Sequence, residues 1–283
     1  MAVLVTGATG NVGRLVVEQL AAAGEDVRAM TRTPGKAVVP HGVTVVKGDL
    51  RDPEGLEFDG VDRLFLFAEP STAREVVGRA VKAGVRRIVV LSSGAVTFGM
   101  DSVHHLPAEQ AVEESGVEWT HVRPGEFMAN KLHLWGPSIR AERIVREAFP
   151  DSAWYPVHER DIADVATVAL RADGHHGSAY DVNGPLISNA DQVRAISAAL
   201  GEEVRLELVS REELRERYLA QGGFAAEMAD FLLGYTDYSG AEADAEDEVD
   251  YAAIDSLPTA EAVTGRPART FADWAQDHLA DFR

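Results

Sequence analysis

The sequence contains no cysteine. This absence excludes disulfide bonds and thiolate metal sites, and it fits a reducing compartment. No uninterrupted apolar run is long enough to cross a bilayer. The first residues turn glycine-rich without the basic segment that opens a signal peptide. We therefore expect a cytoplasmic protein that makes no membrane contact.

Basic residues are scarce: 27 Lys and Arg stand against 46 Asp and Glu, giving a formal net charge of -19. Nucleic-acid affinity needs a basic face, so we expect no nucleic-acid partner. Only four basic residues are lysine, a bias typical of GC-rich bacterial genomes. Six acids and no base fall within Glu242–Asp250, which we interpret as a solvated loop or helix face. The histidines and acids lack ligand spacing such as His-Glu-x-x-His, so no metal site is expected.

Short apolar runs alternate with amphipathic stretches through the first 125 residues. This alternation predicts a parallel sheet with helices on both faces and right-handed crossovers, the doubly wound α/β arrangement called the Rossmann fold. The expected strands are Ala2–Thr6, Asp26–Thr31, Val43–Lys47, Arg63–Phe67, Arg87–Leu91 and Trp119–Arg123. The expected helices between them are Val12–Ala23, Thr72–Ala83 and Leu106–Ser115.

A glycine-rich segment, Gly7–Gly13, directly follows the first expected strand and opens the first helix. In a dinucleotide site Gly7 would permit the tight turn, Gly10 the approach of a pyrophosphate, and Gly13 close packing of helix on strand. Amides at the helix start would hold the anion, helped by the helix dipole. The remaining predicted cofactor contacts in this segment are Thr9, Asn11 and Val12. A structural turn without a ligand is the alternative.

The end of the second strand carries no acid. NAD sites usually place Asp or Glu there to bind the ribose 2′-hydroxyl. Here Arg32 stands at that position and Lys36 follows, and a guanidinium can pair bidentately with a 2′-phosphate. We expect NADP(H) to be preferred over NAD(H), unless Arg32 is only a solvated surface residue. Asp49, followed by Leu50 after the third strand, either contacts the adenine or caps a turn.

Beyond residue 125 the alternation of apolar runs and amphipathic stretches is less regular. We expect a helix at Asp161–Arg171 capped by Asp161, a strand at Ser178–Asn183, and helices at Asn189–Leu200, with Asn189 as its N-cap, and Arg211–Gln221. The domain prediction is an NAD(P)-binding Rossmann domain over 1–155 and a smaller C-terminal α/β substrate lobe over 156–283. The lobe is expected to interleave with the sheet through 178–185.

Six segments together resemble the NmrA-like family of atypical short-chain dehydrogenases over nearly the whole chain. They are Thr6–Gly13, Gly48–Leu50, Leu91–Ser93, Arg123–Gly125, Tyr180–Pro185 and Thr264–Pro267. The family includes NAD(P)H quinone oxidoreductases, triphenylmethane dye reductases, plant ether reductases and a non-catalytic nitrogen regulator. The resemblance therefore implies the fold and cofactor more than the reaction. The Tyr-x-x-x-Lys of ordinary short-chain dehydrogenases is absent, since none of the six tyrosines has a lysine four residues on.

The catalytic candidates are His105 and Ser92. The ether-reductase branch has a lysine where the helix before the sixth strand begins, and counting back along this sequence places His105 there. The quinone oxidoreductase branch has a histidine at this point. Histidine titrates near neutral pH and can protonate the atom that becomes anionic after hydride transfer. A structural hydrogen bond is the alternative for His105, whose neighbour His104 is easily confused with it.

Ser92 ends the fifth strand, where ligands of open α/β sheets collect. It, or the neighbouring Ser93, is expected to contact substrate or the nicotinamide ribose, or else to cap the loop. Pro124 is expected beside the nicotinamide. Three apolar residues could line a cleft for a flat aromatic substrate: Phe127, Met128 and Trp135. Each could instead belong to the hydrophobic core, and for Met128 the core is the favoured alternative.

These observations predict an NAD(P)H-dependent reductase of a quinone, aromatic ketone or similar electrophile, in bacterial specialised metabolism. Two alternatives stay open: an NAD(P)-sensing regulator without turnover, and a redox-neutral epimerase or dehydratase that keeps the cofactor. The expected partner is a small aromatic or quinone-like substrate, and a homodimer is left open.

Overall fold

The computed structural model describes residues 1–242 and 260–283, which form two compact units. The first unit comprises Met1–Pro124, Glu159–Val182 and Pro258–Pro267; the second comprises Gly125–His158, Asn183–Leu257 and Ala268–Arg283. The units do not divide at the expected boundary after residue 155, because 159–182 returns to the first unit. Of the acidic stretch Glu242–Asp250, all but Glu242 lies outside the described residues.

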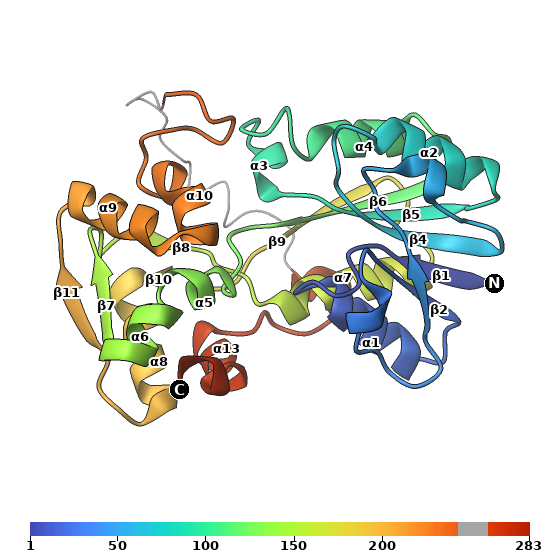
Figure 1. Cartoon of the computed structure of the whole chain (residues 1–283). Coiled ribbons are helices and arrows are strands. Elements are labelled where there is room, and N and C mark those ends of the chain that lie inside the picture. Colours follow the sequence, from blue (N-terminus) through green and yellow to red (C-terminus); the bar gives the residue numbers. More distant parts are fainter. Residues whose placement is uncertain (243–259) are drawn as a thin grey trace. The chain divides into compact units, whose positions relative to one another are not determined.

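The first unit contains a seven-stranded parallel sheet with the order β3-β2-β1-β4-β5-β6-β9 (Figure 1). Its strands are β1 (Ala2–Val5), β2 (Val27–Thr31), β3 (Thr44–Lys47), β4 (Val61–Phe67), β5 (Arg87–Leu91), β6 (Glu118–Pro124) and β9 (Ser178–Val182). The strand order reverses at β1, which lies between β2 and β4. This is the Rossmann arrangement that the apolar runs predict. In such sheets ligands bind at the carboxyl edge, where the order reverses.

Helices cover both faces of this sheet. They are α1 (Gly13–Ala22), α2 (Ala73–Lys82), α3 (Gly94–Thr97), α4 (Leu106–Glu113), α7 (Glu159–Arg171) and α12 (Ala260–Thr264), with short 3-10 turns η1 (Pro34–Lys36) and η2 (Pro53–Gly55). In Figure 1, α2 and α4 lie on one face, and α1 and α7 on the other. The central strands β1, β4 and β5 are largely buried because both faces are covered, which explains their continuous apolar runs, whereas the edge strand β3 is partly exposed.

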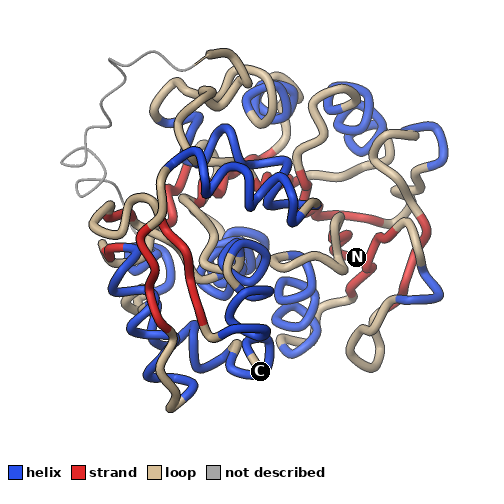
Figure 2. Tube along the Cα trace, turned by 60° about the vertical axis from the view of Figure 1, so that its left-hand side comes forward, coloured by secondary structure: helices blue, strands red, loops and turns tan. Residues whose placement is uncertain are grey.

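The second unit is a smaller α/β lobe, as expected. Its elements are α5 (Asn130–Leu134), α6 (Gly136–Glu142), β7 (Ile144–Glu147), β8 (Ala153–Trp154), β10 (Ile187–Ser188), α8 (Asn189–Leu200), β11 (Arg205–Leu208), α9 (Arg211–Gln221), α10 (Gly223–Leu232), α13 (Phe271–Asp277) and η3 (Leu279–Phe282). Strand β11 pairs with β7 in parallel, and β10 pairs with β8 antiparallel. These short strands (red in Figure 2) contribute fewer residues to the unit than its helices (blue).

Two predicted helix caps are wrong. Helix α7 begins at Glu159, so Asp161 lies inside its first turn instead of capping it. The N-cap of α8 is Ser188, whose hydroxyl accepts the Asp191 amide at 3.1 Å, and Asn189 is already helical. No helix among the described residues combines the length and apolar character needed to cross a membrane.

Candidate functional site

The glycine turn between β1 and α1 has a backbone geometry that favours glycine. Gly7 has φ +58°, in the left-handed region, and its carbonyl accepts the Gly10 amide at 2.9 Å. A Cβ built on Gly13 would lie 2.2 Å from the Gly7 carbonyl oxygen and 2.8 Å from its carbonyl carbon. Helix α1 can therefore begin directly against the turn only because residue 13 has no side chain.

Three amides at this turn point to an anion site. Within the described residues the N–H groups of Asn11, Val12 and Gly13 have no protein acceptor, as is usual at a helix start. The positive end of the helix dipole lies at the same place. Thr9, Gly10 and Asn11 are exposed, whereas the Val12 side chain is buried, so Val12 can offer a ligand only its backbone. Such a cradle fits a pyrophosphate.

The basic residues after β2 are available for a second phosphate. Strand β2 pairs in parallel with β1, so both strands end at the same edge of the sheet. Arg32 follows β2 directly and Lys36 ends η1. Both are exposed, and neither forms an ion pair within the described part of the chain. No carboxylate of residues 1–242 or 260–283 therefore compensates their charges.

After β3, Asp49 acts as a turn cap: its carboxylate accepts the Arg51 amide at 3.0 Å. The neighbouring Leu50 is partly buried, and its carbonyl accepts the Thr72 hydroxyl at 2.6 Å. The turn-cap alternative for Asp49 thus holds, and a contact with adenine stays a prediction.

Phe67 was missed by the sequence reasoning. It ends β4, is 49% exposed, and lies 3.6 Å, measured at its Cβ, from where a Cβ of Gly7 would stand. A half-exposed aromatic side chain beside the glycine turn offers apolar surface to a bound nucleotide. Phe67 ends a strand next to the point where the strand order reverses, and this position in the sequence could have indicated that it lies near a ligand.

Ser92 and Ser93 differ in their surroundings. The Ser93 hydroxyl accepts the Ala95 amide at 3.2 Å and caps α3, so it has the loop-capping role. Ser92 is 3% exposed, and its hydroxyl makes no hydrogen bond of normal length within the described residues. It nevertheless lies close enough to the Glu109 carboxylate to help lower the pKa of that group.

A chain of buried polar contacts joins α4, β6, α3 and β9 on one face of the sheet. Arg123 donates to both oxygens of Glu109 at 2.9 and 2.6 Å and to the Thr97 hydroxyl at 3.2 Å. Thr97 in turn donates to Asp181 at 2.6 Å. Burial would raise the pKa of Glu109, but the hydrogen bonds from Arg123 help bring it below its usual range. Burial raises the pKa of Asp181.

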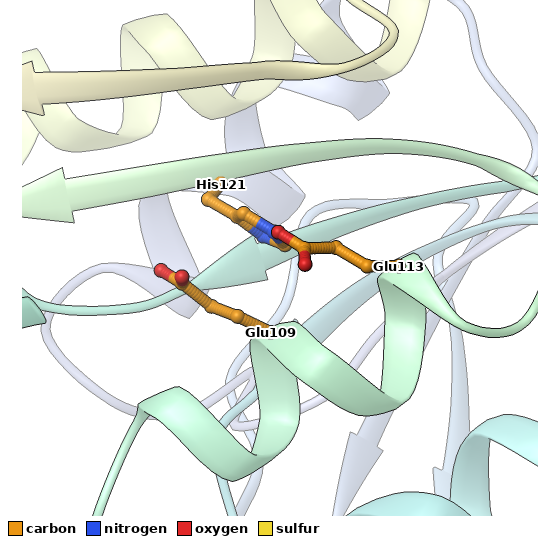
Figure 3. Close-up of side chains that lie close together, drawn as sticks. All are labelled: Glu109, Glu113 and His121. Atoms are coloured by element: carbon orange, nitrogen blue, oxygen red, sulfur yellow. The ribbon is translucent and has the colours of Figure 1, made fainter. Parts of the chain in front are cut away.

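Glu109, Glu113 and His121 place ligand atoms within 4.8 Å of one another, which is the spacing of a metal site (Figure 3). The two carboxylates come from the same face of α4 and point toward the ring on β6. Both oxygens of Glu109 already accept from Arg123, so a cation there would lie beside a guanidinium. The His121 ring contacts Glu113 at 3.1 Å, and burial lowers its pKa. The Glu109–Arg123 ion pair and the His121–Glu113 contact account for this cluster, and we propose no metal there.

His105 lies at the N-cap of α4, and its ring is held by a carboxylate. Nδ1 lies 2.6 Å from Oδ2 of Asp101, a side chain that is fully buried, whereas the ring itself is 25% exposed. His104 donates its backbone amide to the same carboxylate, at 2.8 Å. The sequence predicted His105 as a site residue but not Asp101. The acid four residues before His105 was the signal that could have indicated the pair.

The three apolar residues expected to line a substrate cleft lie in the second unit with different burial. Met128 is fully buried and Trp135 is 2% exposed; both belong to the hydrophobic core of the unit. Their burial favours the core alternative for these two residues, and a place for them beside a substrate stays a prediction. Phe127 is partly exposed and remains a prediction. Pro124 ends β6, its carbonyl oxygen 3.4 Å from the position of a Cβ on Gly94.

Comparisons with known proteins bear directly on this site. Residues 7–173 match the family model described as NAD(P)H-binding. The chain is 38% identical to the (4-alkanoyl-5-oxo-2,5-dihydrofuran-3-yl)methyl phosphate reductase of Streptomyces griseus, over 99% of each chain. It is 33% identical to the NAD(P)H azoreductase of Xenophilus azovorans, also over 99% of each chain.

A solved structure shows the same fold. The triphenylmethane reductase of Citrobacter sp., complexed with NADP(H), superimposes with a TM-score of 0.76 over 99% of this chain and 100% of that one. The two sequences are 20% identical.

Proposed function

Because the chain belongs to the NAD(P)H-binding family, and within it to the NmrA-like atypical short-chain dehydrogenases, we propose that it is an NADPH-dependent reductase of a quinone-like or similarly conjugated electrophile. The observation that carries this proposal is the glycine turn, with three amides and two cations at the same sheet edge that have no partner among the residues the structure describes. A cytoplasmic location and a homodimeric assembly belong to the same proposal.

The residues present fit a dinucleotide. The amides of Asn11, Val12 and Gly13 hold the pyrophosphate, and the open surface above Gly10 lets it approach the backbone. Arg32 and Lys36 hold the 2′-phosphate that distinguishes NADPH from NADH. A carboxylate at residue 32 would instead repel that phosphate.

The substrate class follows from what the chain lacks. Without Tyr-x-x-x-Lys it lacks the usual proton donor of short-chain dehydrogenases, which favours a substrate whose product anion is stable by itself. The names of the two relatives describe electron-poor acceptors: an azo group, and a ring double bond with two carbonyls on one of its carbons. A doubly activated double bond spreads the new charge over oxygen atoms, so a weak acid suffices to complete the reaction.

The protein then contributes orientation and a proton. When bound, NADPH supplies a hydride to the electron-poor end of the double bond. His105 supplies the proton that neutralises the other end, since its ring is partly exposed at the start of α4. Ser92 is buried beside Glu109, and its expected contact with the substrate or the nicotinamide ribose stays a prediction.

The test is NADPH oxidation followed by absorbance, with a panel of quinones, azo dyes and acyl-dihydrofuranones. We expect decay only when enzyme and acceptor are both present. Binding of NADPH without turnover of any acceptor would favour a sensor over a reductase. With Arg32→Asp, NADPH should bind about 10- to 100-fold more weakly, the value of a charged hydrogen bond, while NADH binding stays within about twofold. Equal losses for both coenzymes would overturn the 2′-phosphate role.

A further inference from the structure

The loop between α3 and α4 reverses the usual pattern of burial. Its acid, Asp101, is 2% exposed, whereas Met100 and Val103 on either side are 43% and 47% exposed. Burying a carboxylate is costly unless hydrogen bonds compensate it. The buried position of Asp101 therefore depends on the hydrogen bonds that its carboxylate receives.

Four contacts compensate the Asp101 carboxylate. Oδ1 accepts the amides of Val103 at 3.1 Å and His104 at 2.8 Å. Oδ2 accepts the amide of His105 at 3.0 Å and meets its ring Nδ1 at 2.6 Å. Burial would raise the pKa of Asp101, but these hydrogen bonds outweigh burial and lower it. The carboxylate is thus ionised at neutral pH and can only accept.

An acceptor-only oxygen 2.6 Å from Nδ1 determines which ring nitrogen carries hydrogen. Nδ1 must donate, so the neutral ring of His105 is the Nδ1–H tautomer and Nε2 is the atom that takes up and gives away a proton. A carboxylate that orients a histidine in this way does not itself exchange the proton; it holds the ring and stabilises its charged form.

We propose that Asp101 is a positioning residue that keeps a proton on Nδ1 of His105, so that the ring takes up its second proton at Nε2, as an imidazolium, and delivers that proton to the reduced substrate. The inference rests on the proposed reductase function. The exposed Met100 and Val103 give the same loop an apolar surface that suits a conjugated substrate better than a charged one. The proton passes from Nε2 to the substrate anion, and the ring regains one from solvent.

The first experiment determines the tautomer of His105 in the native protein. Full-length protein labelled with ¹⁵N-histidine gives long-range ¹H–¹⁵N correlations that identify the protonated ring nitrogen. His105→Gln removes the His105 signals and so assigns them. We expect the Nδ1–H pattern for His105 in the native protein. An Nε2–H pattern would overturn the proposal whatever the activity.

The second experiment compares Asp101→Asn with the native enzyme. The amide keeps one oxygen for the loop amides but no longer compels Nδ1 to donate. We expect Nε2–H signals to appear. We also expect kcat to fall on the order of 100-fold, a typical contribution of general acid catalysis to the rate, while KM for NADPH stays within about twofold of the native value. His104→Gln is the matched control and should leave both the His105 pattern and kcat unchanged.

The two readouts separate the possible failures. If Asp101→Asn keeps the Nδ1–H pattern and full kcat, Asp101 does not position the ring. If the native tautomer is as expected but His105→Gln retains full kcat, the pair is structural and the proposal fails, while the reductase function stands. If no acceptor is turned over at all, the reductase function itself fails, and the proposed proton delivery fails with it.

Discussion

Replacing Gly13 with alanine tests the glycine turn against a matched helical glycine. Gly78 lies in the middle of α2 on its exposed side, and a Cβ built there meets nothing within 4 Å. Gly78→Ala should therefore raise the free energy of unfolding by about 0.5–1 kcal/mol through helix propensity alone. At Gly13 the added methyl group would meet backbone atoms of the glycine turn.

At Gly13 the new methyl group would lie 2.2 Å and 2.8 Å from the carbonyl oxygen and carbon of Gly7. Both are backbone atoms, which cannot turn aside as a side chain could. The turn must move, and overpacking of this kind costs about 1–3 kcal/mol. Because the moved segment carries the phosphate-binding amides, NADPH affinity should also fall about tenfold or more.

Urea denaturation and titration of NADPH measure the two effects on the same proteins. We expect Gly13→Ala to lose both stability and affinity, and Gly78→Ala to gain stability with native affinity. If the two variants shift stability in the same direction and bind NADPH equally, the close approach of α1 to the turn does not build the site.

Two further predictions concern buried charges. Glu109→Gln leaves the Arg123 guanidinium without its carboxylate and should lower the free energy of unfolding by about 3 kcal/mol in urea denaturation; a loss below about 1 kcal/mol would contradict the buried ion pair. The pKa of Asp101 is lowered in the folded protein, so its stabilisation is present above the unfolded pKa and is lost as pH falls through the folded one. Asp101→Asn should therefore flatten the stability profile below about pH 4, and an unchanged acid limb would contradict this assignment.

The sheet could be predicted from the sequence because its strands are short, mostly buried and followed by a turn or helix signal. Helix α1, expected over 12–23, spans Gly13–Ala22, and α2 and α4 agree to within two residues. The family motifs carried the cofactor prediction, since Gly7 has a φ that favours glycine and a side chain at residue 13 would meet the backbone of the turn.

Contacts between distant elements could not be predicted in the same way. Glu109 pairs with Arg123 across a helix and a strand, and no spacing along the chain indicates which acid meets which base. The Asp101–His105 contact depends on a loop conformation set by backbone amides that curl around the carboxylate. The spacing of apolar residues indicates which face of a helix or strand is buried. A loop has no such repeat, so its side-chain contacts cannot be predicted in this way.

The second unit was the less predictable part. Strands β8 and β10 have two residues each, too few to show alternation, and β7 and β11 have four. Trp135 resembles a substrate-lining residue in sequence but is buried in the core, because aromatic side chains serve both purposes. The caps of α7 and α8 differ from expectation because neighbouring polar residues compete for the same position.

Backbone amide resonances followed during titration with NADPH test the central claim most directly. The account predicts that the largest shifts occur at Asn11, Val12 and Gly13, with Arg32 among the next affected, and that NADH moves Arg32 much less. Binding of NADPH that leaves these amides unshifted would contradict the account, as would the absence of binding.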